Sequence, residues 1–415
     1  MDASDDWLPR RIMDRIAEAM ADTPVVCLLG PRQSGKSSLV KRAFPKRTYY
    51  SFDDTGLQAT AQHDPAGFVA SLPESVTLDE VHRVPEVLPA IKMAVDENRR
   101  PGRFLLTGSA NLLLLPSVSE SLAGRIEIVR LHPLTEAEKE RKPGRLVVNF
   151  LEGNIRARIG PSAPDASDLI NRILRGGYPE AMRRPNMTRV RQWHREYLDA
   201  LIEKDARDVA NLRNLDHLSR LMTLLSTQTA TLLAIETVAK HLAIRRETVQ
   251  NNLAALERLF LVRRLPAWHV NEARRLVKAP KVHVVDSGLA ATLSELQAED
   301  WTKRRDRFSH LVESFVVQQL IAQAQWTDSN PQFWHYRDRN KFEVDVVMTR
   351  GRKTWGVEVK ASAKVTPADG AGLRRLAEQC GKDFQGGMIL YVGASTIRTV
   401  DPRTMAVPIS ELWTS

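Results

Sequence analysis

An apolar stretch followed by a glycine-framed loop is the feature that most constrains this chain. Residues 25 to 29 are apolar, and residues 30 to 37 read Gly-Pro-Arg-Gln-Ser-Gly-Lys-Ser. Glycines let backbone N–H groups turn toward phosphate oxygens, a lysine reaches the β- and γ-phosphates, and a serine hydroxyl ligates Mg²⁺. The pattern predicts a strand, a phosphate-binding loop and a helix that hold ATP with Mg²⁺. The residues expected to contact the nucleotide in this loop are Gly30, Pro31, Arg32, Gln33, Ser34, Gly35, Lys36, Ser37 and Ser38.

A second apolar strand is expected just before the adjacent carboxylates Asp79 and Glu80. At the end of this strand Asp79 would hold Mg²⁺ together with Ser37, and Glu80 would orient the water that attacks the γ-phosphate. Taken alone, the pair would also suit a helix N-terminus. Beside the phosphate loop, the catalytic interpretation is favoured.

A third apolar strand, residues 103 to 106, leads into the small polar residues Thr107, Ser109 and Asn111, which are candidates for sensing the γ-phosphate. Farther on, Arg125 precedes another apolar stretch at residues 126 to 131, so it is expected just before the start of a strand. From there it could stabilise transition-state charge in a neighbouring subunit, which predicts a homo-oligomer. A surface arginine at a helix end is the alternative.

These motifs resemble those of AAA+ ATPases of the AAA_14 type, which share Gly-Pro-Arg-Gln-x-Gly-Lys, Leu-Thr-Gly-Ser and Ala-Gly-Arg. Later segments resemble the DUF4143 region that usually follows this ATPase. They are residues 176 to 180 (Gly-Gly-Tyr-Pro-Glu), residues 281 to 289, which include Val-Asp-Ser-Gly-Leu at 285 to 289, and residues 342 to 345 (Phe-Glu-Val-Asp). The resemblance covers nearly the whole chain. It implies an intracellular prokaryotic ATPase with a nuclease-like C-terminal domain.

Composition narrows the class of partner. The 415 residues are 43% hydrophobic, which is enough for several domains with cores of their own. The net charge of +10 favours a polyanion, most simply DNA, although an ordinary arginine-rich surface would give the same excess. Two cysteines outside any C-x-x-C pair indicate neither zinc nor a disulfide framework. The acidic N-terminus and the lack of a long apolar run predict a cytoplasmic protein with no membrane partner.

The middle of the chain carries a helix-turn-helix pattern. Residues 235 to 242 form one short amphipathic segment, and a second opens at Arg245 and runs to about residue 260. The second helix of such a unit presents its first residues to the DNA major groove, although the same fold also docks proteins. The candidate DNA contacts are Arg245, Arg246, Thr248, Gln250 and Asn251.

The C-terminal third predicts a β-hairpin at residues 342 to 360. A turn centred between residues 351 and 352 sets Asp345 opposite Glu358 and Glu343 opposite Lys360 on one face. The other face would bury Val344, Val346, Trp355, Val357 and Val359.

Two carboxylates opposed across a hairpin repel each other, and a bound cation would remove that cost. Asp345 and Glu358, with Glu313 from an upstream helix, are therefore expected to ligate Mg²⁺ or Mn²⁺, while Lys360 stabilises phosphate charge. The set looks like a PD-(D/E)xK nuclease site in an α-β-β-α-β order. A cross-strand ion pair between Glu343 and Lys360, or a nuclease-derived domain that grips DNA without cutting it, would fit the spacing too.

The sequence thus predicts an α/β protein with a P-loop AAA+ type ATPase core, a helical and winged-helix middle, and a PD-(D/E)xK nuclease-like α/β C-terminal domain. The expected boundaries are 1–142 for the ATPase, 143–228 for a linker and helical region, 229–280 for the winged helix, and 281–415 for the nuclease-like domain. The expected function is ATP hydrolysis that controls DNA engagement or metal-dependent DNA cleavage. The alternatives are an ATP-dependent DNA motor or branched-DNA remodeller with a non-cleaving C-terminal domain, and a signalling switch acting through protein partners.

Overall fold

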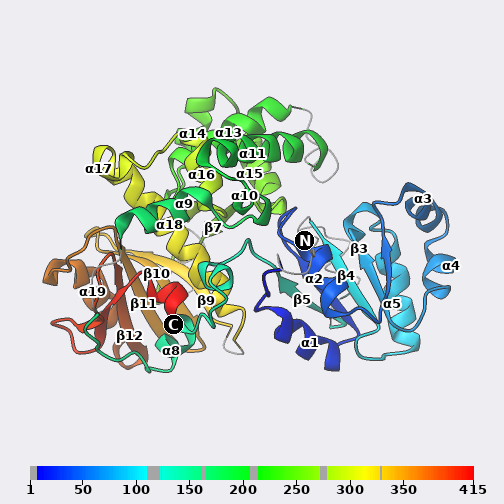
Figure 1. Ribbon diagram of the computed structural model, residues 1–415, viewed down its shortest axis with the longest axis horizontal. Helices are drawn as coiled ribbons and strands as arrows, with labels where there is room; N and C mark the ends of the chain where they lie inside the picture. Colours follow the sequence, from blue (N-terminus) through cyan, green and yellow to red (C-terminus); the bar gives the residue numbers. More distant parts are fainter. Residues whose placement is uncertain are drawn as a thin grey trace.

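The computed structural model divides into a P-loop domain, a helical lobe and a second α/β lobe, seen at the right, top and left of Figure 1. It describes residues 7–109, 122, 124–160, 165–205, 214–271, 278–327 and 330–415. The sensor candidate Asn111 lies outside these ranges.

The P-loop domain is built on a parallel sheet with the strand order β2-β3-β4-β1-β5. Its strands are β1 (Val25–Leu29), β2 (Thr48–Ser51), β3 (Val76–Asp79), β4 (Phe104–Gly108) and β5 (Ile126–Arg130). The helices around it are α1 (Met13–Asp22), α2 (Lys36–Ala43), α3 (Thr55–His63), α4 (Pro65–Ala70) and α5 (Val87–Glu97). Every residue of β1 is buried, as expected for a strand with helices on both faces. Because the strands are parallel, the residues that follow β1, β3 and β4 meet at one edge of the sheet.

The helical lobe combines a bundle with a helix-turn-helix and a small antiparallel sheet of order β6-β8-β7. The bundle contains α9 (Ala166–Arg175), α10 (Pro179–Met182), α11 (Met187–Ala200), a π-helical turn (Leu201–Asp205), α13 (Leu215–Thr227) and α16 (Ser287–Leu293). The remaining elements are α14 (Ile235–Leu242), α15 (Arg246–Arg258), β6 (Thr231–Leu232), β7 (Val262–Leu265) and β8 (Lys281–Val284).

The C-terminal lobe is a mixed sheet of order β13-β14-β12-β11-β10-β9 with helices on its faces. Its strands are β9 (Gln332–Arg337), β10 (Glu343–Arg350), β11 (Lys353–Lys360), β12 (Phe384–Tyr391), β13 (Ile397–Arg398) and β14 (Thr404–Pro408). Its helices are α8 (Leu146–Leu151), α17 (Asp300–Lys303), α18 (Arg305–Ala324), α19 (Ala371–Cys380) and α20 (Glu411–Thr414). The α-β-β-α-β order expected from the sequence did not include β9, a strand that the structure adds between α18 and the hairpin.

The predicted hairpin register is confirmed along the ladder. Strands β10 and β11 pair from Val346–Val357 to Arg350–Lys353, with the turn centred where the sequence placed it. The ladder ends one pair before Asp345 and Glu358.

One expectation about the hairpin faces was wrong, because β10 carries a register shift against β9 between Val344 and Val347. Val344 therefore packs with Leu373 on α19, whereas Val346 joins the core on the other side of the sheet. The alternative ion pair of Glu343 with Lys360 is not formed. Glu343 pairs instead with Arg337 on β9, with 2.7 Å between Oε1 and Nη1, and Lys360 pairs with Glu358. A bulge turns successive side chains to faces that strict alternation does not give.

The helical and C-terminal lobes share one apolar core, which extends from Leu146 to Trp413 in the sequence. Helix α8, in the segment expected to be a linker, packs on β12 and α18. Strand β8 pairs with β7 and β6 of the helical lobe although it follows the predicted boundary at residue 280. The P-loop domain has two cores of its own.

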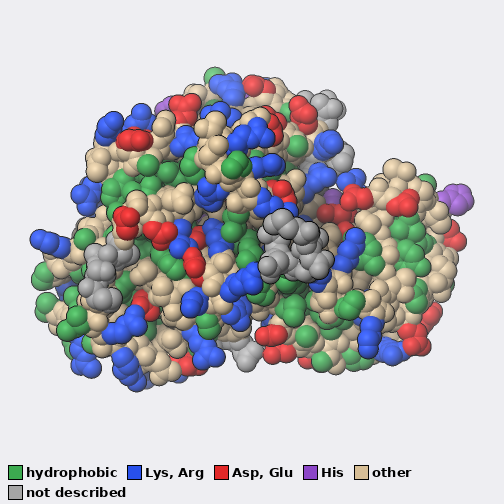
Figure 2. Space-filling view, in the orientation of Figure 1, with side chains coloured by type: hydrophobic (Ala, Val, Ile, Leu, Met, Phe, Trp, Pro, Cys, Tyr) green, Lys and Arg blue, Asp and Glu red, His purple; other side chains and the backbone are tan. Residues whose placement is uncertain are grey.

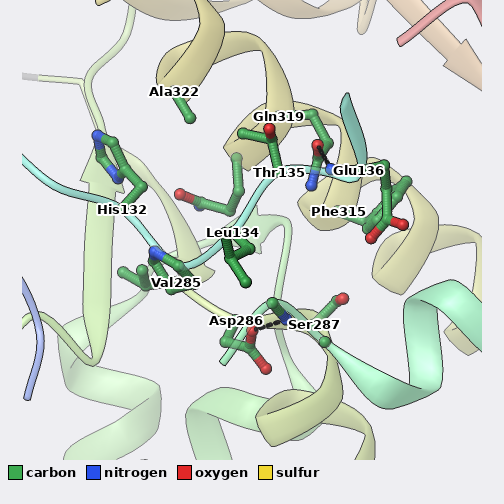
Figure 3. Close-up of a pocket in the computed structure, with 14 residues that line it drawn as sticks. His132, Leu134, Thr135, Glu136, Val285, Asp286, Ser287, Phe315, Gln319 and Ala322 are labelled. Atoms are coloured by element: carbon green, nitrogen blue, oxygen red, sulfur yellow. Dashed lines mark hydrogen bonds between the residues drawn. The ribbon is translucent and has the colours of Figure 1, made fainter. Parts of the chain in front are cut away.

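The three parts meet around a small polar cavity of about 20 Å³, enough for one water molecule. Figure 3 shows the segment from His132 to Glu136 running between α18 and residues Val285 to Ser287. Asp286 caps α16 by accepting from Leu289 N, and its other oxygen accepts from Gly177 N at 2.7 Å. A side chain at Gly176, where φ is +73°, would overlap the Asp286 carboxylate. The contact of this loop with Asp286, where the helical and C-terminal lobes meet, therefore requires glycine before α10.

Candidate nucleotide site and C-terminal ion cluster

The phosphate loop has the backbone geometry that its glycines predict. Gly35 has a φ of +96°, which is open to glycine, and α2 begins at the next residue. A Cβ atom at Gly30 would lie 2.1 Å from the carbonyl oxygen of Leu131, so only glycine fits where β1 enters the loop. Lys36 is buried, and its Nζ donates to the carbonyl oxygens of Gly30 at 3.0 Å and Pro31 at 3.1 Å. The ammonium group is therefore held inside the loop at the N-terminus of α2.

Asp79, at the end of β3, accepts hydrogen bonds from three hydroxyl groups. The Ser37 hydroxyl donates to Asp79 Oδ2 at 2.9 Å, and the hydroxyls of Thr107 and Tyr49 also donate to this carboxylate. Burial, followed by the hydrogen bond to Asp79, raises the pKa of Tyr49, so this phenol stays a donor. Ser37 and Asp79 are thus adjacent, as a shared Mg²⁺ requires, and both supply the oxygen ligands that Mg²⁺ prefers.

Glu80 is held in a left-handed backbone conformation, with φ at +56°. Its Oε2 accepts from Ser109 N at 3.0 Å and lies 3.1 Å from His82 Nδ1. Burial alone would raise its pKa, but the His82 hydrogen bond and the Lys36 charge outweigh burial and lower the pKa of Glu80 to about 2. Non-glycine residues with positive φ are concentrated at functional sites. A fixed, ionised carboxylate at this point can accept a hydrogen bond from water.

The helical lobe supplies a wall of the nucleotide site that the sequence pattern did not predict. A cleft of about 630 Å³ lies against the phosphate loop, and Figure 2 shows the surface hollowed between the P-loop domain and the helical lobe. Beyond the loop and Glu80, its lining includes Trp7, Arg10, Arg141, Pro179, Glu180 and Arg183. The Gly-Gly-Tyr-Pro-Glu motif was the available signal, but its residues predict only a turn before a helix.

Two hydrogen-bonded contacts fix the phosphate loop to other parts of the chain. The Tyr197 hydroxyl on α11 donates to the Arg32 carbonyl oxygen at 3.0 Å and lies 3.2 Å from the Tyr178 hydroxyl. Arg10 is buried, and its guanidinium donates to the Ser34 carbonyl oxygen at 2.7 Å and to Glu138 at 3.0 Å. Movement of the loop would therefore be transmitted to the helical lobe and the N-terminal segment.

Arg125 lies at the amino-terminal ends of the strands, on the side of the sheet away from the phosphate loop. Its carbonyl oxygen accepts from Val25 N at the start of β1, whereas the loop follows the end of that strand. Its guanidinium forms a two-point ion pair with Asp96 on α5, at 2.5 and 3.0 Å. Because the strand separates it from the loop of its own chain, Arg125 could reach a γ-phosphate only in another subunit.

If Arg125 acts between subunits, mixing Arg125→Ala protein with Lys36→Ala protein should restore hydrolysis that neither variant shows alone. A mixed oligomer would bring an intact loop from one variant against an intact arginine from the other. Steady-state phosphate release across a range of mixing ratios measures this recovery. No recovery in an oligomer confirmed to contain both variants would assign Arg125 to the ion pair with Asp96 alone.

The C-terminal carboxylates surround a lysine that the sequence pattern did not single out. Lys281 is only 4% exposed, and its Nζ lies 2.7 Å from Glu313 Oε1 on α18 and 3.0 Å from Asp345 Oδ1 on β10. Asp345 Oδ2 accepts from Val359 N at 2.9 Å. Burial opposes ionisation of Asp345, but Lys281 and this N–H lower the pKa of the carboxyl group. Lys281 is the first residue of the segment 281 to 289, and the resemblance of that segment gave no sign of its role.

Glu358 and Lys360 form a second pair on β11, with 2.8 Å between Oε1 and Nζ. Burial, followed by the nearby charge of Asp345, raises the pKa of Glu358, and the same two causes raise the pKa of Glu313 to about 8. The predicted residues therefore converge, but lysines bind them in this arrangement. Among the described residues, no three His, Cys, Asp or Glu side chains are grouped as ligands of one metal ion. In this arrangement Lys281 and Lys360 pair with the carboxylates, while the enclosed Oε2 of Glu358 makes no hydrogen bond among the described residues.

The candidate DNA contacts lie on α15 and the turn before it. Arg245, Arg246, Gln250 and Asn251 are exposed, and Thr248 is half-buried. Arg246 is 3.2 Å from Glu236 on α14. The first turn of α15 thus presents polar side chains outward, while Val249 and Leu253 enter the core.

Three family models match this chain in order. Residues 22–139 match AAA_14, an AAA domain; residues 166–300 match DUF8612, a domain of unknown function; and residues 308–412 match DUF4143, also a domain of unknown function. The chain therefore carries an AAA_14 domain followed by a DUF4143 domain. Together with the five-stranded parallel sheet and the phosphate loop, the AAA_14 match establishes the fold of an AAA-type P-loop ATPase.

Relatives with similar sequences occur in mycobacteria. The uncharacterized protein Rv2008c of Mycobacterium tuberculosis is 28% identical over 361 residues, which cover 87% of this chain and 75% of that protein. The uncharacterized protein Mb2031c of Mycobacterium bovis gives the same values.

Among solved structures, the Walker-type ATPase paby2304 of Pyrococcus abyssi aligns with a TM-score of 0.42 at 18% identity, covering 70% of this chain and 97% of that one. The RuvB Holliday junction branch migration motor of Thermotoga maritima aligns with a TM-score of 0.28 at 18% identity, covering 61% and 89%. In the described part of this chain, no helix is both long and apolar enough to cross a membrane.

Proposed function

We propose that this protein hydrolyses ATP and that its nucleotide state controls engagement of DNA. The observation that carries the ATPase proposal is the meeting of Lys36, Ser37, Asp79 and Glu80 at one edge of the parallel sheet. Lys36 would bind the β- and γ-phosphates, Ser37 and Asp79 would hold Mg²⁺, and Glu80 would orient the attacking water. Ser109, whose N–H fixes Glu80, would couple this carboxylate to the end of β4.

The contacts of the phosphate loop support control by nucleotide. Tyr197 binds the backbone of the loop, Tyr178 lies beside Tyr197, and the adjacent Gly177 binds Asp286 at the joint with the C-terminal lobe. Lys281 lies five residues before Asp286, at the start of β8. A change in the loop would therefore act on a chain of packed, hydrogen-bonded groups that reaches the C-terminal ion cluster.

DNA is the proposed partner because the chain has a net charge of +10 and exposes polar and basic side chains at the start of α15. The order of α14, α15, β7 and β8 suits a winged helix. Figure 2 shows Lys and Arg side chains scattered over the visible face among acidic ones, so charge alone marks no single site there. The helix-turn-helix is therefore a more specific argument for DNA binding than the net charge.

The ion cluster favours a C-terminal domain that grips DNA without cutting it in the state described. Lys281 lies between the carboxylates of Glu313 and Asp345, where a metal-dependent nuclease would need an ion. Metal-dependent cleavage is the second candidate, supported by the convergence of Glu313, Asp345, Glu358 and Lys360. It would require a metal ion to bind Asp345 and Glu358 beside the ion pairs of Lys281 and Lys360. A signalling switch that binds proteins through α15 is the third.

One experiment separates these functions. ATP hydrolysis by the purified protein is measured without DNA and with linear, single-stranded or branched DNA, while the DNA is checked for cleavage with Mg²⁺ or Mn²⁺. Stimulation by DNA without cleavage is the expected result. Hydrolysis that is indifferent to every DNA would favour the signalling switch, and the absence of hydrolysis under all conditions would overturn the ATPase proposal.

We expect the double substitution Arg245→Ala with Arg246→Ala to weaken duplex binding and to flatten its dependence on salt. For every phosphate that the substituted protein no longer neutralises, the slope of log K against log salt should fall by about 1. Fluorescence anisotropy with a labelled duplex at several salt concentrations measures the slope. Arg220→Ala, at an exposed position of α13, is the matched control and should leave the slope unchanged. Equal slopes for the double variant and the control would remove α15 from the DNA interface.

A further inference from the structure

A second groove opens where the three parts of the molecule meet, away from the phosphate loop. It has a volume of about 660 Å³, and its walls come from β5 of the P-loop domain, from α15 and β7 of the helical lobe, and from the segment leading into β9. Two arginines, Arg130 and Arg263, line it together with Phe260, Phe333 and Trp334.

Arg263 occupies this groove without the acidic partner that a buried guanidinium normally has. Its Nη2 donates to His132 Nδ1 at 3.3 Å, whereas its Nη1 is fully enclosed and makes no hydrogen bond. Within the described ranges, neither Arg263 nor Arg130 lies within 4.0 Å of a carboxylate. A guanidinium with an enclosed, unpartnered donor and no carboxylate beside it carries a desolvation cost, and an anion bound at the accessible part of the half-buried side chain would balance its charge.

The neighbouring charges increase that cost. Burial, followed by the charge of Arg130, lowers the pKa of Arg263 to about 9. The pKa of His132 is also well below its usual value, because of burial and then the charges of Arg263, Arg130 and Arg10. His132 is therefore neutral and accepts from Arg263 without balancing its charge. The cluster as a whole is cationic.

Arg264, the next residue on β7, is an arginine whose charge is neutralised by an ion pair. Arg264 forms a two-point ion pair with Glu257 on α15, at 2.8 and 2.6 Å. Arg263, Arg264 and Glu257 all line the groove. Arg264 is exposed and has a carboxylate partner, whereas Arg263 is half-buried and has none among the described residues. This difference selects Arg263 as a ligand-binding group and Arg264 as its internal control.

The aromatic residues indicate which anion the groove takes. Phe260, Phe333 and Trp334 are half-buried, so part of each ring remains accessible from the groove. The Trp334 indole is fixed by donating to Thr349 Oγ1 at 2.9 Å. Unpaired bases stack on such rings while guanidinium groups bind their phosphates, and in a duplex the base faces are already covered.

We propose that this groove binds single-stranded nucleic acid, with a phosphate between Arg130 and Arg263 and bases on the aromatic side chains. The site is distinct from the first turn of α15, which is proposed above for duplex DNA. Because the walls come from the P-loop domain and both other lobes, a strand held here would contact all three parts at once.

Binding of a labelled oligothymidine of about 15 nucleotides tests the proposal, with anisotropy as the readout. Arg263→Gln should weaken binding about 10- to 100-fold, since it removes a charged hydrogen bond to phosphate. Arg264→Gln should bind within about twofold of the unsubstituted protein. Equal loss in both variants, or no loss in either, would overturn the site. ATP hydrolysis without DNA should be the same in both variants, which separates failure of this site from failure of the ATPase.

Thermal unfolding gives an independent readout. Without ligand, Arg263→Gln should raise the melting temperature, because it removes an enclosed charge that lacks a partner. In the Lys36→Ala background, which removes the competing phosphate loop, pyrophosphate should raise the melting temperature only when Arg263 is present. A lower melting temperature for Arg263→Gln with no effect of pyrophosphate would make Arg263 structural. Stabilisation by pyrophosphate without oligothymidine binding would overturn the nucleic-acid assignment and leave a site for small phosphates.

Discussion

Glu80→Gln protein should bind ATP as tightly as the unsubstituted protein and hydrolyse it about 100-fold or more slowly. The amide keeps the shape of the side chain but loses the ionised carboxylate that Lys36 and His82 stabilise. Lys36→Ala should instead lose both binding and hydrolysis, because its ammonium would contact the phosphates in the ground state as well as the transition state. Titration with a fluorescent ATP analogue and steady-state phosphate release measure the two effects separately.

The matched control for Lys36→Ala is Lys46→Ala, an exposed lysine that follows the same helix α2. It should leave both binding and hydrolysis unchanged. If Glu80→Gln hydrolyses ATP at the original rate, another group orients the water. If Lys36→Ala also retains full activity, the nucleotide does not bind at this loop.

Replacing Lys281 with Met should cost about 3–5 kcal/mol of the free energy of unfolding, the largest stability loss that we expect from a single substitution in the ion cluster. The change leaves Glu313 and Asp345 buried without the ammonium between them. Denaturation by urea, followed by circular dichroism, measures the loss. Mn²⁺ should recover part of it, because a divalent ion could then take the place of the missing charge.

Lys278→Met is the control for this substitution, since Lys278 lies three residues earlier and donates only to the Arg337 carbonyl oxygen among the described residues. It should change stability by no more than about 1 kcal/mol. If Lys281→Met costs no more than this control, the ion cluster contributes little to the fold. A second variant, Lys281→Met with Glu313→Gln and Asp345→Asn, removes the stranded charges and should recover stability.

The parts of the molecule that follow a local rule could be predicted from the sequence. The phosphate loop, the carboxylates after β3 and the register of the β10–β11 hairpin depend on residues close together in the chain, where strand alternation and turn position decide the geometry. These local features also brought Asp345 and Glu358 close together. Glu313 could be placed near Asp345 and Glu358 because its amphipathic helix was expected to pack on the sheet that carries them.

The parts that depend on distant contacts could not be predicted. Lys281 follows the helix-turn-helix by many residues and shows no spacing that relates it to Asp345. The bulge in β10 arises from pairing with β9, a strand that the sequence pattern did not reveal, and it moved Val344 to the other face. Arg263 and Arg264 are adjacent and chemically identical, and only their different burial and the position of Glu257 distinguish them.

The single apolar core of the helical and C-terminal lobes has a consequence for how this protein can change over evolutionary time. Family models divide this half into two segments, yet the residues of α8, α13, α18 and β11 pack in one interior. A gene fusion that transferred only the last hundred or so residues would expose an apolar surface of α18 that α9 and α16 now cover. Recombination is therefore expected to exchange this half as a whole, whereas the P-loop domain, with its separate cores, could be inherited alone.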